Sequence, residues 1–299
     1  MKKNSPWILW LLGLLISPHA QAVIMAGSDG QGNTNAPPDD PGWANVGRIS
    51  TAFSSVTYLG SDWFLTAYHI QQLDQPTSVL VNGSTYAVDT SSWHRLSYSG
   101  IDADLAMFRV TNTVTGLPTL TLSPHLVTNG ASVTMIGDGT DRQSSLTYWN
   151  SAWQVTNSAD GVYSGFYWAA STGTKRWGQN VADDAGWLND GFGTTYCFGT
   201  TFDANGGANE AQGAIYDSGG GVFFKDGADW ELAGIMLTVG GYSGQPSSAA
   251  VYGDATYMAD LEPYHDQIVT IMAIPEPAGV ILAGVGALCL IRRVRRWRS

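Results

Sequence analysis

Three residues, each at the edge of an apolar, strand-like segment, carry the side chains that nucleophilic catalysis needs. Ser218 follows Asp217 and precedes three glycines within residues 214–223, where the backbone can turn sharply and expose a hydroxyl. A serine hydroxyl is a weak nucleophile, so it requires a histidine base and a carboxylate that orients the base. His69 ends one apolar segment and Asp104 opens another. These residue types predict acyl transfer by Ser218, His69 and Asp104.

Other residues of these types are expected to be structural or exposed. His94, His125 and His265 have no motif around them, and Asp102 competes with Asp104 as the orienting carboxylate. The chain has 2 cysteines, and the one in its body is Cys197. No adjacent residue would activate this thiol, so we expect it to be a small buried side chain.

The composition predicts an all-β fold that positions these residues. The 299-residue chain contains 36 glycines, 12 tryptophans and 13 tyrosines, and short strand-like segments alternate with turn residues. Residues 49–59 and 63–67 read as a hairpin around 60–62, and a proline-containing connection within 116–130 divides the body into two halves. This spacing favours barrels or sandwiches over alternating β and α units. Residues 256–272 have a helical period and predict a short closing helix.

The charge distribution excludes a nucleic acid as the expected partner. Of the 14 basic residues, seven lie at the two ends of the chain, and the body between them is rich in the 25 acidic residues. Such a segment repels phosphate backbones. A soluble, exported body with a protein or peptide substrate fits this charge better.

The N-terminal segment predicts export. Lys2 and Lys3 precede an apolar run, and residues 20–22 (Ala-Gln-Ala) are the small-residue pattern that a signal peptidase reads. We expect a signal peptide over 1–22, a mature start at Val23 and a mobile lead-in over 23–45, rich in Gly, Asn, Asp and Pro. Calcium binding in this lead-in is an alternative, but we expect no metal and no cofactor.

The C-terminal segment predicts sorting at a membrane. Pro275-Glu276-Pro277 leads into the hydrophobic segment 278–291, which we interpret as a transmembrane helix, and then into an arginine-rich end. This order over 275–299 resembles the PEP-CTERM tail of Gram-negative bacteria. The resemblance implies an exosortase-type partner that cuts near Pro-Glu-Pro. It also implies transient inner-membrane association and final placement at the cell surface or in the extracellular matrix.

The three candidate residues also lie in motifs that resemble those of trypsin/chymotrypsin-like serine proteases, particularly exported bacterial ones. The family's Thr-Ala-Ala-His, Asp-apolar-Ala-apolar and Gly-Asp-Ser-Gly-Gly-Pro motifs are similar to residues 66–69, 104–107 and 216–221. The resemblance covers the body, which we assign as a protease domain over 46–272. It implies two antiparallel six-stranded β-barrels with the active site between them and a C-terminal helix outside. Serine endopeptidase activity through an acyl-enzyme intermediate is the implied function.

The resemblance also assigns roles around the nucleophile, and this chain departs from the family there. Tyr216 stands where the family has the glycine whose amide, with that of Ser218, forms the oxyanion hole. Gly221 replaces the motif's proline. Gln212 is at the position that helps to set primary specificity; it carries no charge, although Glu210 nearby keeps a basic preference open.

Asp217 raises a hypothesis about activation. In activated family members the matching aspartate pairs with a freed, β-branched N-terminus. Signal cleavage before Val23 would expose such a terminus, so export could double as activation. The alternative is a loose N-terminus with Asp217 held by local amides.

Two further functions stay open at this stage. A catalytically weak or inactive surface or matrix protein with a protease fold is the main alternative, because fold alone does not give function. An esterase using the same triad is less favoured, because residues 216–220 are not a Gly-x-Ser-x-Gly elbow and no alternating β/α pattern surrounds them.

Overall fold

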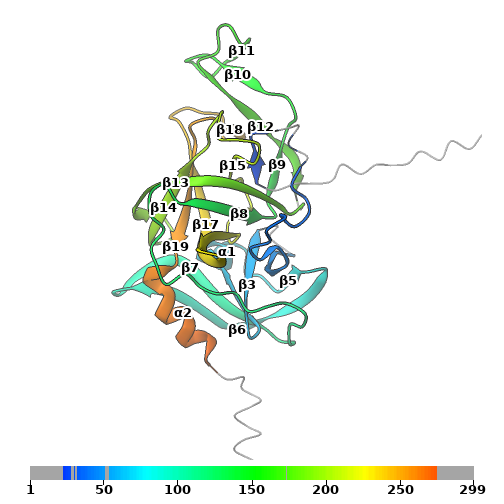
Figure 1. The fold of residues 1–299 in the computed structure, drawn as a ribbon, viewed down its shortest axis with the longest axis vertical. Helices are drawn as coiled ribbons and strands as arrows, with labels where there is room; N and C mark the ends of the chain where they lie inside the picture. The colour runs from blue at the N-terminus through cyan, green and yellow to red at the C-terminus, as the bar shows by residue number, and fades with distance from the viewer. Residues whose placement is uncertain (1–22, 28–29, 31, 51–53, 173, 275–299) are drawn as a thin grey trace, which may run out of the picture.

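The computed structural model describes residues 23–27, 30, 32–50, 54–172 and 174–274, and these form two closed antiparallel barrels stacked along the long axis (Figure 1). The predicted fold class, two six-stranded barrels with a short C-terminal helix, is confirmed. The signal peptide, the C-terminal tail and its hydrophobic segment lie outside the described residues. Within those ranges, no helix is long and apolar enough to cross a membrane.

Barrel 1 is built from consecutive strands in the order β2-β3-β4-β7-β6-β5. Its strands are β2 (Val46–Ile49), β3 (Ser55–Gly60), β4 (Trp63–Thr66), β5 (Ser78–Val81), β6 (Ser84–Tyr98) and β7 (Ile101–Val110). The expected hairpin is β3–β4, because Ser61 and Asp62 have φ of 49° and 65°, the left-handed values that a tight hairpin turn requires. Phe64 and Phe108 stack inside, with ring centroids 5.6 Å apart.

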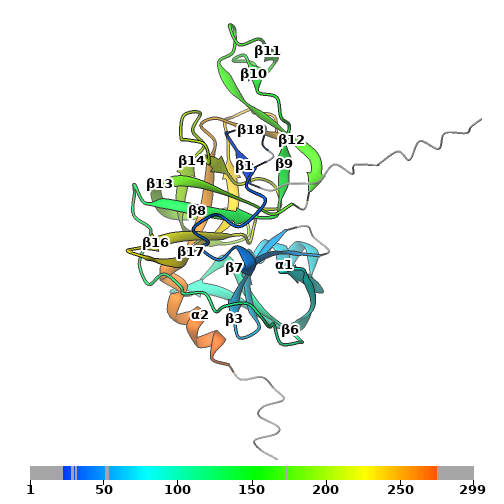
Figure 2. The same ribbon diagram turned by 45° about the vertical axis from the view of Figure 1, so that its right-hand side comes forward.

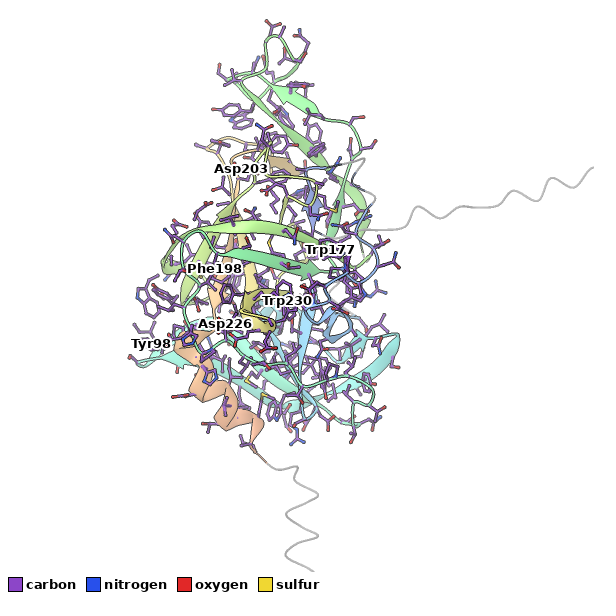
Figure 3. The ribbon with its side chains drawn as sticks, viewed as in Figure 1. Tyr98, Trp177, Phe198, Asp203, Asp226 and Trp230 are labelled. Carbon is purple, nitrogen blue, oxygen red and sulfur yellow. The ribbon has the colours of Figure 1, made fainter. Side chains whose placement is uncertain are left out.

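Barrel 2 has the order β13-β14-β19-β17-β16-β8. Its strands are β8 (Ser132–Gly137), β13 (Arg176–Asn189), β14 (Thr194–Thr201), β16 (Gly221–Asp226), β17 (Asp229–Gly240) and β19 (Ala255–Asp260). Phe198 of β14 lies in its core and is fully buried (Figure 3). Both barrels pair their strands antiparallel, which excludes the parallel sheet that an α/β-hydrolase esterase would need.

A smaller sheet extends barrel 2 on the side away from barrel 1 (Figures 1 and 2). It contains β9 (Thr140–Arg142), β10 (Thr147–Trp149), β11 (Val155–Thr156), β12 (Tyr163–Thr172) and β18 (Ala249–Val251). We call β10, β11, the first half of β12 and the turns between them the arm. Trp149, Trp153, Tyr163 and Tyr167 pack together within it.

The closing helix is shorter than its periodicity predicts. Residues 255–260 form β19, because they pair with both β14 and β17 and complete barrel 2. Only η2 (Glu262–Tyr264) and α2 (His265–Met272) are helical. The helix α2 docks on barrel 1 through buried Ile268, and Gln267 Oε1 accepts a hydrogen bond from the Ser97 amide of β6 at 3.0 Å.

The first described residues are held against barrel 2. The strand β1 (Ile24–Met25) pairs with β15 (Ala211–Gln212), and Arg142 donates to the carbonyl oxygens of Met25 and Gly27 at 2.7 and 3.0 Å. Further along the lead-in, η1 (Trp43–Asn45) precedes β2. The composition of residues 23–45 indicated none of these contacts.

Candidate active site

The histidine and the carboxylate predicted from the sequence lie in contact on barrel 1. His69 is in the first turn of α1 (Tyr68–Asp74), directly after β4, and Asp104 lies on β7, which pairs with β4. Asp104 accepts two hydrogen bonds from His69, one from Nδ1 at 2.6 Å and one from the backbone amide at 2.7 Å. This double contact fixes the position of the imidazole and favours the tautomer with a proton on Nδ1.

Asp104 is fully buried, and this determines its electrostatics. Burial raises the pKa of the Asp104 carboxyl, and the hydrogen bonds and charge of His69 oppose this shift. Its backbone amide donates to Thr195 Oγ1 of barrel 2 at 2.8 Å, so the carboxylate lies at the junction of the barrels. The competing Asp102 is instead exposed and lies 3.6 Å from Arg95.

Ser218 comes from the loop between β15 and β16 of barrel 2 and lines the same cavity as His69. Its hydroxyl donates to the carbonyl oxygen of Leu237 at 2.9 Å. Barrel 1 helps to hold this loop, because Thr57 of β3 donates to the carbonyl oxygen of Gly219 at 3.0 Å. The order of strands thus brings a residue of barrel 2 to the two residues of barrel 1.

Tyr216 adopts the left-handed backbone conformation, with φ of 74°. This conformation costs an L-residue about 1–2 kcal/mol, which explains why glycine is the easier residue here. Hydrogen bonds from barrel 1 stabilise this strained conformation, because the amide and the hydroxyl of Ser55 both donate to the carbonyl oxygen of Tyr216, at 3.0 and 3.2 Å. The loop therefore accommodates tyrosine. Among the described residues, the Ser218 amide donates no hydrogen bond.

Asp217 is buried behind this loop and faces the first described residue. Its carboxylate accepts hydrogen bonds from the amides of Ala214 (2.8 Å), Gly139 (3.0 Å) and Val23 (3.1 Å). Burial raises the pKa of Asp217 to about 7 against the effect of these hydrogen bonds. Val23 has φ of 51°, which is an outlier for a β-branched residue.

The cavity at Ser218 and His69 has a volume of about 320 Å³. Its lining includes the acidic residues Asp74, Asp190 and Asp217 as well as the uncharged residues Gly213, Ala214, Val239 and Thr256. The Gly213 amide donates to Thr256 Oγ1 at 2.9 Å.

The two expected specificity residues lie outside the residues that line this cavity. Gln212 is fully buried and pairs with Ile24 across β1 and β15. Glu210 is buried beside Asn180, whose Nδ2 donates to it at 2.9 Å, and burial raises the pKa of Glu210 to about 7. A role of either residue in specificity stays a prediction.

The remaining candidates do not join the site. Cys197 is buried with a pKa raised to about 12 by burial, which confirms the structural interpretation of this thiol. His94 packs against Trp63 in barrel 1, and His265 lies beside Asp266 at the start of α2. Within the described part of the chain, no three His, Cys, Asp or Glu residues gather in a way that could hold a metal ion.

Sequence reasoning missed three residues that shape the site. Phe192, in the turn between β13 and β14, packs against His69 with ring centroids 5.2 Å apart. Ser55 fixes Tyr216, and Arg142 holds the segment after Val23. None has a local motif, because each acts through a contact between segments more than 100 residues apart or across the two barrels.

Comparison with known proteins gives a structural likeness without a sequence match. No protein-family model and no curated protein sequence matches the chain. A mutant of human heparin binding protein (CAP37) is similar in structure, with a TM-score of 0.52 and 14% identity over 82% of this chain and 98% of that one.

Two other solved structures are similar to the chain at lower scores. The inactive form of a mutant of Rv3671c from M. tuberculosis has a TM-score of 0.47 and 13% identity over 81% of this chain and 94% of that one. The HtrA-type protease AlgW, solved with a decapeptide, has a TM-score of 0.44 and 15% identity over 74% of this chain and 51% of that one. The two closed barrels and the likeness to the heparin binding protein mutant show that the chain has the two-barrel, chymotrypsin-like fold.

Proposed function

We propose that the protein is a serine endopeptidase in which Ser218, His69 and Asp104 form the catalytic triad. The observation that carries this proposal is the buried Asp104 carboxylate, which holds both Nδ1 and the backbone amide of His69 on the cavity that Ser218 lines. A buried carboxylate that orients a histidine beside a serine is the arrangement that activates a hydroxyl at neutral pH.

In the proposed reaction the Ser218 hydroxyl turns from the Leu237 carbonyl oxygen toward His69 Nε2. Oγ attacks the carbonyl carbon of the scissile bond as its proton passes to Nε2, and Asp104 stabilises the imidazolium that forms. The proton then goes to the leaving amine as the C–N bond breaks. Water hydrolyses the acyl-enzyme by the same route, with His69 again as the base. No cofactor is required for these steps.

The amides of Tyr216 and Ser218 are the proposed donors of the oxyanion hole. The positive φ of Tyr216 and the two hydrogen bonds from Ser55 to its carbonyl oxygen support this assignment, because they fix the peptide units beside the nucleophile. Two amides that point at the developing oxyanion stabilise it at no reorganisation cost during reaction.

We further propose that cleavage before Val23 activates the enzyme. The Val23 nitrogen already lies 3.1 Å from the Asp217 carboxylate. A free ammonium at this place would form a buried ion pair with Asp217, and cleavage would release the positive φ of Val23. Both changes favour the conformation of the Tyr216 loop that is described here.

Export and sorting are proposed from sequence alone. A signal peptide over 1–22 would deliver the chain, and the PEP-CTERM-like segment 275–299 would hold it transiently at the inner membrane of a Gram-negative bacterium. An exosortase-type enzyme would then release it to the cell surface or the extracellular matrix. The substrate would accordingly be an extracytoplasmic protein or peptide.

The second candidate function is a catalytically weak or inactive surface protein. The observation that favours it is the hydrogen bond of the Ser218 hydroxyl to Leu237 rather than to His69. Hydrolysis of fluorescent casein by the chain beginning at Val23 separates the two. Hydrolysis that disappears in Ser218→Ala supports the peptidase, and equal rates in the two proteins contradict it.

A further inference from the structure

A second cavity, of about 240 Å³, lies next to the candidate active site and shares Val239 with it. Its walls are the end of β17 (Val239, Gly240), Trp168 of β12, the loop residues Tyr242 and Gln245, and Asp254. We call it the Asp254 pocket. None of its lining residues is a lysine or an arginine.

Two buried polar atoms of this pocket lack partners among the described residues. Asp254 is 3% exposed; its Oδ2 accepts hydrogen bonds from the Val251 amide (2.8 Å) and from Gln245 Nε2 (2.7 Å), but Oδ1 accepts none. Trp168 Nε1 is also buried and donates to none. A buried acceptor without a donor costs about 1–3 kcal/mol, so a ligand that donates to Oδ1 recovers this free energy.

The arm keeps the pocket open by holding its rim. Trp153 stacks on Tyr163 with ring centroids 4.1 Å apart, and both rings contact Tyr242. Trp153 Nε1 donates to the carbonyl oxygen of Ser243 at 3.0 Å. The Tyr242 amide donates to Gln245 Oε1, so the same glutamine joins the rim to Asp254. The pocket is thus preformed, which lowers the cost of binding.

The strand β17 connects the nucleophile to this pocket. One edge of its last residues pairs with β19, through Val239↔Thr256 and Gly240↔Ala255. The pairing of the other edge with β16 ends at Ile235↔Gly221, so among the described strands none pairs with that edge beyond Ile235. An extended peptide can add to such an edge by main-chain hydrogen bonds.

We take the added peptide to run antiparallel to β17, in the way that the described neighbours of β17 pair with it. A substrate strand antiparallel to β17 runs from Gly240 toward Leu237, where the Ser218 hydroxyl lies. Residues beside Val239 and Gly240 therefore precede the cleaved bond. At about 3.3 Å per residue, the side chains that reach the Asp254 pocket are about two to four positions N-terminal to that bond.

We propose that the Asp254 pocket binds a basic side chain of the substrate, from a residue two to four positions before the cleaved bond. This inference rests on the proposed peptidase function. A lysine or arginine supplies the donor that Asp254 Oδ1 lacks, and the aromatic residues Trp168 and Tyr242 line the same cavity.

The test compares quenched fluorescent peptides that carry either lysine or norleucine at the second, third or fourth position before the cleaved bond. Lysine at one of these positions should raise kcat/KM by about 10-fold or more over norleucine. In Asp254→Asn this preference should fall to less than about 2-fold, because kcat/KM of the lysine peptide falls toward that of the norleucine peptide. No lysine preference in the wild-type chain, or an undiminished one in Asp254→Asn, overturns the proposal.

Asp254 also accepts a hydrogen bond within its own turn, from the Val251 amide. A second variant therefore tests the pocket without changing Asp254. Ser247→Leu, on the exposed rim, places a larger side chain into the pocket without touching the hydrogen bonds of Asp254, and it should also lose the lysine preference. If Asp254→Asn does not fold, Ser247→Leu serves as the test. A Ser247→Leu variant that keeps the preference for lysine over norleucine contradicts the proposal.

A binding measurement separates this proposal from the proposed function. Fluorescence anisotropy of the lysine and norleucine peptides with the Ser218→Ala variant needs no catalysis. Tighter binding of the lysine peptide supports the pocket even if no peptide is cleaved, in which case the peptidase function alone fails. Equal binding of the two peptides to folded protein contradicts the pocket.

Discussion

Replacing Asp104 by asparagine should reverse the tautomer of His69 while leaving the fold intact. The carboxylate now accepts from two donors of His69, the backbone amide at 2.7 Å and Nδ1 at 2.6 Å. An asparagine has one carbonyl oxygen, and the backbone amide can only donate, so the oxygen faces the backbone. The side-chain NH₂ then faces Nδ1 and turns that nitrogen into an acceptor.

With Nδ1 as the acceptor, the proton of neutral His69 lies on Nε2, which can no longer take the proton of Ser218. The loss expected for this tautomer is about 10⁴-fold in kcat. The assay is hydrolysis of a quenched fluorescent peptide near pH 7.5, with thermal unfolding to show that the variant folds.

Asp102→Asn is the matched control, because Asp102 is exposed and contacts Arg95 rather than His69. We expect its kcat to stay within about 2-fold of the wild-type value. If Asp102→Asn loses activity and Asp104→Asn keeps it, the assignment of the orienting carboxylate is refuted.

Three further predictions concern the loop around the nucleophile. Two residues added before Val23 should lower kcat/KM by about 10²-fold relative to the chain that begins at Val23. The N-terminal nitrogen of the longer chain could no longer reach Asp217, so the oxyanion hole would lose its support. Equal activity of both chains would dismiss the activation hypothesis. In the full chain, Asp217 has a folded-state pKa of about 7 against an ordinary value of 3.8, so its stabilising contribution is complete below about pH 3.8 and is lost as the pH rises to about 7. The wild-type Tm should therefore fall more steeply than that of Asp217→Asn as the pH rises from 4 to 7. Parallel plots of Tm against pH for the two proteins would argue against a raised pKa of the buried Asp217 carboxyl. Tyr216→Gly should raise the free energy of unfolding, measured in urea, by about 1 kcal/mol, because glycine adopts a φ of 74° without strain. Tyr216→Val should lower this free energy. A glycine variant less stable than the wild type would show that the tyrosine ring contributes more stability than the backbone strain costs.

The sequence predicted those parts of the fold and site that local patterns encode. The hairpin β3–β4 follows from its apolar strands and turn residues, and the contact between His69 and Asp104 was expected from motifs that each lie within a few residues. The sequence patterns gave a wrong prediction where pairing with strands distant in the sequence determines the structure. Residues 256–260 belong to the segment with a helical period but form part of β19, because two neighbouring strands need a partner between them.

The packing of the arm against Tyr242 and the Asp254 pocket had no signal in the sequence for the same reason. The strands β13 and β14 run through a segment rich in Gly, Asn and Asp, and Trp153 meets Tyr242 across 89 positions of chain. The Val23–Asp217 contact was raised only as a hypothesis, because it joins residues 194 positions apart. Each of these contacts depends on closure of barrel 2, which no local pattern records.

Covalent labelling with a fluorophosphonate tests the triad most directly, because the reagent reacts with a serine only when a base activates the hydroxyl. We expect labelling of the folded chain that begins at Val23, and its loss in both Ser218→Ala and His69→Ala. Absence of labelling in the folded wild-type chain, or labelling that persists in Ser218→Ala, would contradict the account.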